Sequence, residues 1–125
     1  MSYDLRIRVK VEGCDVYAEI ARPEYDSPTY NLGQLFRSCM DWDYSQSEKG
    51  DDGKYHSVYY RCADIIKNVE QGIRELRAHP KKYEHLLPEN GWGTMHGAIK
   101  SLESLRDCIY EQAEDIPIEC LWMSW

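Results

Sequence analysis

The residues best suited to bind a ligand lie between positions 59 and 82, where positive charge gathers beside aromatic rings in an otherwise acidic chain. The candidate ligand-binding residues are Tyr59, Tyr60, Arg61, Arg74 and Arg77, with Lys67, Lys81 and Lys82 nearby. Cationic side chains bind phosphates and aromatic rings stack on bases, so this set suits an anionic ligand such as a nucleotide. Asp64, Glu70 and Glu75 are interspersed, which is typical of the solvated face of an amphipathic helix. We favour the helix face and keep the ligand site as the alternative.

Oxygen-bearing side chains in the segment 41–52 are spaced as in a helix–loop–helix calcium site. They are Asp41, Asp43, Ser45, Ser47 and Asp52. Such a loop needs a glycine for its sharp turn where this chain has Gln46, and it needs a bidentate Glu where this chain has the shorter Asp52. We therefore interpret the segment as a solvated loop and predict no metal site.

Histidines and cysteines show no spacing typical of a metal site or an activated nucleophile. The histidines are His56, His79, His85 and His96, and the cysteines are Cys14, Cys39, Cys62, Cys108 and Cys120. No two histidines stand four apart on a predicted helix, and no C-x-x-C pair occurs. We interpret the cysteines as reduced, mostly buried thiols of a reducing cytosol. No glycine-rich phosphate loop or G-x-S-x-G motif is present, so we name no catalytic residue and expect neither enzyme activity nor a cofactor. A catalytic site assembled from scattered residues stays open.

The aromatic residues are ten Tyr and four Trp against a single Phe. Tyr and Trp join an apolar body to a polar tip, so they suit either binding surfaces or the edges of a core. The residues that we predict to contact a partner protein are Tyr25, Tyr30, Trp42, Tyr44, Trp122 and Trp125. The most distinctive segment is Pro88–Gly93, in which Gly91 and Gly93 allow a tight turn around Trp92. We favour Trp92 as a plug between two helices, and the alternative is an exposed anchor for a partner.

Three strands are predicted to position these residues. Apolar and polar residues alternate over 3–11 and again over 16–20, with Gly13 in the turn between them, which predicts an antiparallel hairpin. The last segment, 118–125, is apolar on both faces and is predicted to be a strand that is paired centrally or covered on both sides. If one face of this tail is left uncovered, a second copy of the chain would cover it. We therefore predict a homodimer with Trp122 or Trp125 at the contact.

Three main helices are predicted from apolar residues at three-to-four spacing. The first follows Thr29 or Asn31 as its cap and runs from Leu32 to Met40. The second is capped by Ser57, runs over 58–76 before Pro80, and holds Gly72 where another helix can pack closely. The third is capped by Thr94 and runs over 95–109, after a short helical turn at 80–87. The polar segment 43–54 is the longest predicted loop.

The fold class that these elements predict is α+β, in a single domain over residues 1–125. A three-stranded antiparallel sheet, made of the hairpin and the C-terminal strand, should pack one face on the three helices. The alternating row from Leu5 to Val11 should then lie beneath the second helix. An apolar content of 42% and a charged content of 30% are ordinary for a globular domain of this length.

The net charge of −7 bears on the kinds of partner. It argues against direct binding to nucleic acid or to an anionic membrane surface. No apolar run reaches the length of a membrane span, and the N-terminus runs straight into a strand without the pattern of a signal peptide. We predict a cytoplasmic protein.

Several segments of the chain resemble small uncharacterised proteins of phages and prophages. They are Met1–Asp4, Thr29–Phe36, Lys82–Tyr83 and Pro88–Gly93, in the same order over most of residues 1–110. The resemblance implies the cytoplasm of a bacterium that hosts a phage, and it brings no catalytic residues. The segments 43–54 and 118–125 have no counterpart in the resemblance.

The predicted function is that of a non-enzymatic accessory protein which binds and modulates or inhibits a host protein, including counter-defence roles such as those of anti-CRISPR proteins. The absence of a catalytic motif, the acidic charge and the excess of Tyr and Trp favour it. The alternative is a small-ligand binder that sequesters a signalling nucleotide through the residues at 59–77.

Overall fold

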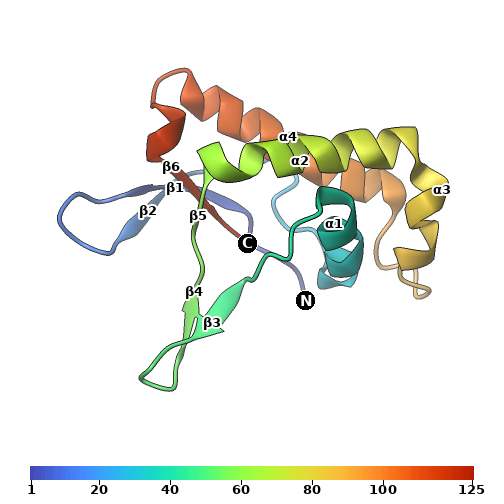
Figure 1. Cartoon of the computed structure of the whole chain (residues 1–125), viewed down its shortest axis with the longest axis horizontal. Coiled ribbons are helices and arrows are strands. Elements are labelled where there is room, and N and C mark those ends of the chain that lie inside the picture. Colours follow the sequence, from blue (N-terminus) through green and yellow to red (C-terminus); the bar gives the residue numbers. More distant parts are fainter.

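The computed structural model describes residues 1–125 as a sheet, a layer of helices and a projecting hairpin (Figure 1). The sheet contains β1 (Arg6–Lys10), β2 (Tyr17–Ala21), β5 (Tyr60–Arg61) and β6 (Leu121–Ser124), and the hairpin contains β3 (Ser47–Lys49) and β4 (Tyr55–Ser57). The helices are α1 (Gly33–Met40), α2 (Cys62–Ala78), α3 (Pro80–Tyr83) and α4 (Met95–Ala113). Short 3-10 turns cover Tyr30–Leu32, Glu84–Leu86 and Ile118–Cys120.

The α+β class is confirmed, but the sheet has four strands instead of the predicted three. Its order is β2-β1-β6-β5 and every neighbouring pair is antiparallel. The C-terminal strand is paired on both sides, by β1 and by β5, as its two apolar faces predicted. The strand is shorter than predicted, because residues 118–120 form a 3-10 turn.

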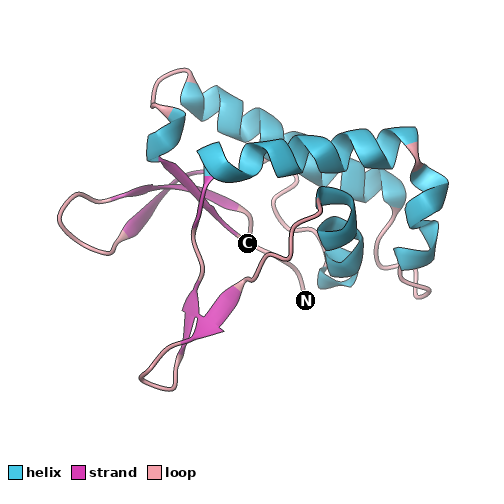
Figure 2. Cartoon of the chain, in the orientation of Figure 1, coloured by secondary structure: helices cyan, strands magenta, loops and turns pink.

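Helices α2 and α4 run side by side, with the sheet beneath one end of the pair and α1 beneath the middle (Figures 1 and 2). The buried core lies between the sheet and the helices. The sheet contributes four fully buried residues: Leu5 just before β1, Ile7 in β1, and Leu121 and Met123 in β6. The predicted row ends earlier than expected, since Val11 is exposed beyond the end of β1. Val16, just before the edge strand β2, and Ile20, within it, are exposed as well.

Gly72 lies where α1, α2 and α4 cross, as the sequence predicted. A Cβ atom at this position would stand 2.7 Å from Cγ of Met40 and 3.0 Å from Cδ1 of Leu102. Both distances are shorter than side chains tolerate without moving. The glycine therefore offsets its poor helix propensity by allowing the close approach of three helices.

The prediction that Ser57 caps a helix beginning at Val58 is wrong. Ser57 ends β4, Tyr60 and Arg61 pair with β6, and α2 begins only at Cys62. The segment predicted as one long loop contains half of the β3–β4 hairpin, which extends away from the rest of the molecule (Figure 1). The predicted cap of α4 is confirmed, because Oγ1 of Thr94 accepts from the backbone N–H of Gly97. Thr29 caps the 3-10 turn that precedes α1, where its Oγ1 accepts from the backbone N–H of Asn31, and α1 itself has no side-chain cap.

Candidate binding groove beside Trp92

Trp92 projects into solvent, and the prediction that it plugs a space between helices is wrong. Its side chain is 68% exposed, which is rare for a residue with so much apolar surface. The space at this point is filled instead by Leu32, whose Cδ2 would stand only 2.9 Å from a Cβ placed on Gly93. The alternative stated for this segment, an exposed anchor, agrees with this exposure.

The turn that carries Trp92 is held by local contacts. Gly91 has a φ of 75°, a left-handed conformation that favours glycine. The backbone N–H of Trp92 donates to Oδ1 of Asn90 at 2.9 Å. On the other side, Gly93 packs against Leu32 and Thr29, and Thr94 caps helix α4. The exposed ring therefore stands on an ordered turn, which lowers the conformational entropy that it would lose on binding.

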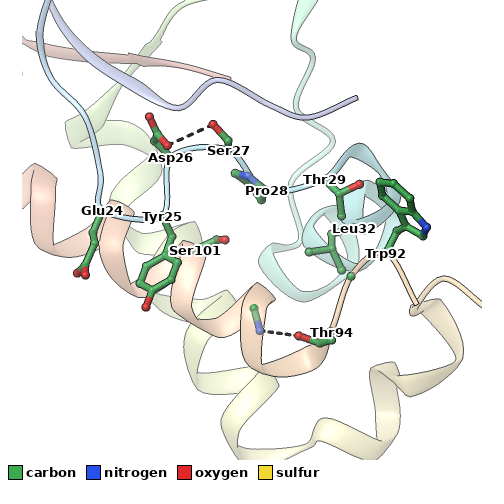
Figure 3. Close-up of a pocket in the computed structure, with 12 residues that line it drawn as sticks. Glu24, Tyr25, Asp26, Ser27, Pro28, Thr29, Leu32, Trp92, Thr94 and Ser101 are labelled. Carbon is green, nitrogen blue, oxygen red and sulfur yellow. Dashed lines mark hydrogen bonds between the residues drawn. The ribbon is translucent and has the colours of Figure 1, made fainter. Parts of the chain in front are cut away.

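A groove of about 520 Å³ begins at Trp92 and ends at Tyr25 (Figure 3). The linker between β2 and α1 forms one wall, and the first two turns of α4 form the other. The lining residues between its two aromatic ends are Asp26, Ser27, Pro28, Thr29, Leu32, Gly93, Thr94, Gly97 and Ser101, with Glu24 beside Tyr25. Tyr25 is 46% exposed, so an exposed aromatic residue lies at each end of the groove.

The linker wall is fixed to the start of the chain by hydrogen bonds. The backbone N–H groups of Tyr3 and Leu5 donate to the carbonyls of Pro28 and Asp26, both at 2.8 Å. The Arg6 guanidinium holds the carboxylate of Asp26 at 3.1 Å. The backbone N–H of Tyr25 donates to Oγ of Ser104 on α4 at 3.2 Å, which ties the linker to the opposite wall. Because both walls are tied in this way, the groove is formed before any partner arrives.

Two carboxylates, those of Glu24 and Asp26, lie at the Tyr25 end of the groove. Asp26 contacts Arg6, which it shares with Asp4 and Glu19. Glu24 has no cationic group within 4.0 Å, although Lys100 and Arg106 line the adjoining pocket. No arginine, lysine or histidine lines the groove. A ligand that places a positive charge beside Glu24 would complement this end.

The predicted partner contacts do not form one surface. Tyr25 lies at the groove, but Tyr44 and Trp125 are buried and their rings stack at a centroid distance of 4.0 Å. Trp42 is half-buried against Tyr44 and Tyr60, and the Tyr30 hydroxyl accepts from Nε2 of Gln46. Trp122 is half-buried on the outer face of the sheet. Leu121 and Met123 are buried within the chain itself, so only the face with Trp122 is partly open, and the homodimer stays a prediction.

The predicted ligand set at 59–77 is not brought together. Arg61 precedes the first residue of α2, whereas Arg74 lies about 20 Å further along the same helix at 1.5 Å per residue. Arg77 is paired with Glu103 of α4. Tyr59 stacks on Tyr17, whereas Tyr60 contacts Trp42. The basic residues of α2 are therefore mainly its solvated face.

No cluster of three or more His, Cys, Asp or Glu side chains is placed to hold a metal ion. Asp41 ends α1 in a left-handed conformation with a φ of 49°, and the predicted solvated loop continues into β3. Asp52 contacts His56 at 3.1 Å across the end of the β3–β4 hairpin. Its pKa is lowered, first by a hydrogen bond from the backbone of Lys54 and then by one from His56.

None of the helices is both long and apolar enough to cross a membrane.

Three of the five thiols are core residues, as predicted. Burial raises the pKa of Cys39 and Cys62 to about 12 and that of Cys108 to about 11. These shifts are opposite to the shift that activates a nucleophilic cysteine. Cys14 and Cys120 are exposed.

The difference in burial predicts the reactivity of the thiols towards a thiol reagent such as Ellman's reagent. In the native protein we expect two thiols, Cys14 and Cys120, to react within minutes, and all five to react in denaturant. The absorbance of the released thiolate, followed over time in native buffer and in denaturant, gives the number of reactive thiols in each condition. Fast reaction of more than two thiols in the native state would contradict the burial of Cys39, Cys62 and Cys108.

Comparisons of the chain with protein-family models, with curated proteins and with solved structures find no match. The resemblance to small phage proteins therefore stays a prediction.

Proposed function

We propose that the chain is a non-enzymatic binding protein that holds a segment of a partner protein in the groove between Trp92 and Tyr25. The observation that carries the proposal is the exposed Trp92 ring on its ordered turn at the mouth of a preformed groove. Trp and Tyr are enriched among the residues that dominate binding energy in protein interfaces. Burial of the Trp92 ring by a partner would remove an apolar surface that is otherwise costly to expose.

The chemistry of the groove narrows the kind of segment that fits. The floor and walls offer Leu32 and Pro28 beside the small residues Gly93 and Gly97, which suits an apolar side chain of the partner. The unpaired carboxylate of Glu24 suits a lysine or arginine a short distance away, and the net charge of −7 favours a basic partner surface. The proposed occupant is therefore a protein segment that combines an apolar residue with a basic one.

In the setting that the resemblance implies, the partner is a protein of the bacterial host. Binding alone is sufficient to modulate or inhibit such a protein, when the bound segment belongs to its active surface. Counter-defence inhibition, as by anti-CRISPR proteins, is one form that this function would take.

Trp92→Ala should abolish binding while the fold stays intact. Random peptides displayed on phage are selected on the wild-type protein, and the enriched peptides are titrated against both proteins. We expect peptides with an apolar and a basic residue, and a loss of affinity of about thirtyfold or more in the variant, as for a dominant interface residue. The free energy of unfolding should change by less than about 1 kcal/mol, because most of the ring lies in solvent.

The matched control is Tyr55→Ala, because Tyr55 is 73% exposed on the β3–β4 hairpin and does not line the groove. This variant should bind the selected peptides as the wild type does. Glu24→Gln should weaken peptides that contain a basic residue more than peptides that lack one. Equal affinity of wild type and Trp92→Ala for every selected peptide, or a selection that enriches no peptide, would overturn the proposal.

A further inference from the structure

The outer face of the sheet, opposite the helices, carries a row of cationic and aromatic side chains. In the register of the sheet Arg8 of β1 lies opposite Trp122 of β6, and Trp122 lies opposite Arg61 of β5, so the three side chains share one face. The rings of Tyr17 and Tyr59 stack at 4.0 Å across the same face, and the edge of Trp122 meets Tyr17. We call Arg8, Tyr17, Tyr59, Arg61 and Trp122 the outer-face cluster.

Arg8 differs from most arginines of the chain, because no carboxylate lies within 4.0 Å of it. Arg6, Arg22, Arg37, Arg77 and Arg106 each have such a partner. Nε of Arg8 donates to Oγ of Ser124 at 3.0 Å and Nη1 donates to the Tyr17 carbonyl at 2.9 Å, whereas Nη2 has no protein acceptor. These contacts fix the guanidinium in place. In the sheet Arg8 lies opposite Glu19 of β2, but Glu19 contacts Arg6 and Arg22 instead. A half-buried cation with no carboxylate in direct contact favours an anion from outside the chain.

A cavity of about 400 Å³ opens beside Arg8, between the sheet and the base of the β3–β4 hairpin. Its lining residues are Asp4, Arg8, Gln46, Ser47, Ser57, Ser124 and Trp125. Ser47 and Ser57 lie directly opposite each other in the hairpin, so both side chains are on one face. Both serines are exposed and neither hydroxyl has a hydrogen-bond partner within the protein, whereas Oγ of Ser124 accepts from Arg8. Asp4 is the one carboxylate of the cavity, and it lies 3.7 Å from Nη2 of Arg6.

We propose that this cavity binds a phosphate group, with Arg8 as the counterion and the hydroxyls of Ser47 and Ser57 as hydrogen-bond donors. Guanidinium and hydroxyl donors that converge on one space are the groups that recognise phosphate oxygens. The phosphate has two possible sources, inorganic phosphate and a nucleotide. Tyr59 lies under the Arg8 guanidinium, 5.6 Å from ring centroid to Cζ, so the base of a nucleotide would meet the aromatic rings of the outer-face cluster. This site shares no residue with the groove beside Trp92.

The test is a titration of the isotope-labelled protein, followed by NMR, with inorganic phosphate, with a purine nucleoside monophosphate and with the corresponding nucleoside. We expect shifts at Arg8, Ser47, Ser57 and Ser124 with both phosphate compounds and none with the nucleoside. Tighter binding of the nucleotide, with additional shifts at Tyr17 and Tyr59, would identify the nucleotide as the source. Equal affinity for inorganic phosphate, with no shift at the rings, would identify free phosphate.

The variants Arg8→Gln and Ser57→Ala should each weaken phosphate binding by about tenfold or more, as expected for hydrogen bonds to a charged group. Ser57→Ala removes a hydroxyl that has no partner within the protein, so it should melt as the wild type does and remains informative if Arg8→Gln folds poorly. Arg74→Gln is the matched control, because Arg74 is an exposed cation on α2 that belongs neither to the cavity nor to the outer-face cluster. The absence of shifts with either phosphate compound, or unchanged affinity in Ser57→Ala, would overturn the proposal.

Discussion

The Ile7→Asp variant is expected to lose the folded state. Ile7 is fully buried in β1, where it lies opposite Met123 of β6 and Ala21 of β2. An aspartate here would place a carboxylate in the core without a cationic partner, and the protein would have to bury the charge or protonate it. The cost should exceed about 4 kcal/mol, which is a large part of the whole stability of a domain of this size. Thermal denaturation followed by circular dichroism should show no cooperative transition.

The matched control for this variant is Ile20→Asp, the same substitution on the neighbouring strand. Ile20 lies in the edge strand β2 and its side chain is exposed, so the new carboxylate stays hydrated. We expect a change in the free energy of unfolding of about 1 kcal/mol or less. A normal melt of Ile7→Asp would mean that the sheet does not pack on the helices through this face.

Trp125→Ala is expected to cost about 4 kcal/mol, because a large buried ring is lost and a cavity is left behind. Trp125 is the last residue of the chain, yet its ring stacks on Tyr44 at 4.0 Å and meets the ring of Tyr3 at 5.2 Å. It thereby ties the C-terminus to the N-terminus and to the segment after α1. Chemical denaturation should show a lower midpoint with a similar slope, and the loss should be greater than for any exposed aromatic of the chain.

Trp125→Phe separates the packing of the ring from its polar atom. Nε1 of Trp125 is the one buried side-chain donor or acceptor in the chain that has no hydrogen-bond partner. Removing this N–H removes a penalty of about 1–3 kcal/mol, which offsets much of the apolar surface that is lost with the second ring. We expect a net change of about 1 kcal/mol or less. Equal losses for Trp125→Phe and Trp125→Ala would contradict a packing role for the aromatic stack.

The sequence predicted those elements whose residue pattern is long enough to be distinctive. Strict alternation over 3–11 predicted β1, and the apolar character of both faces of the tail predicted that β6 is central. Strand β5 was missed because Tyr60 and Arg61 are too few to show alternation. The start of α2 was placed too early because Val58 continues the helical spacing, whereas pairing with β6 keeps the segment extended. Tertiary contacts decide such short segments.

The candidate sites were less predictable, since they depend on which of several side chains occupies a given space in the folded structure. The two glycines around Trp92 permit a turn, but they do not determine whether the ring packs inward or projects into solvent. Leu32 occupies the inner space, and that contact joins residues about sixty positions apart in sequence. Arg8 belongs to the polar face of an alternating strand, and its lack of a carboxylate is visible only once the sheet and the β3–β4 hairpin are placed. The signal that pointed to the groove was the exposed-anchor alternative for Trp92.

Site-specific photocrosslinking in bacterial cells, the setting that the proposed function assumes, tests that function most directly. A photoreactive phenylalanine analogue is incorporated at position 92 or 25 of the groove, or at position 55 or 110, where exposed tyrosines lie outside it. We predict that illumination joins positions 92 and 25 to the same single host protein, and that positions 55 and 110 give no such product. If positions 92 and 25 give no product, or the same set of products as positions 55 and 110, the groove beside Trp92 does not bind a partner protein.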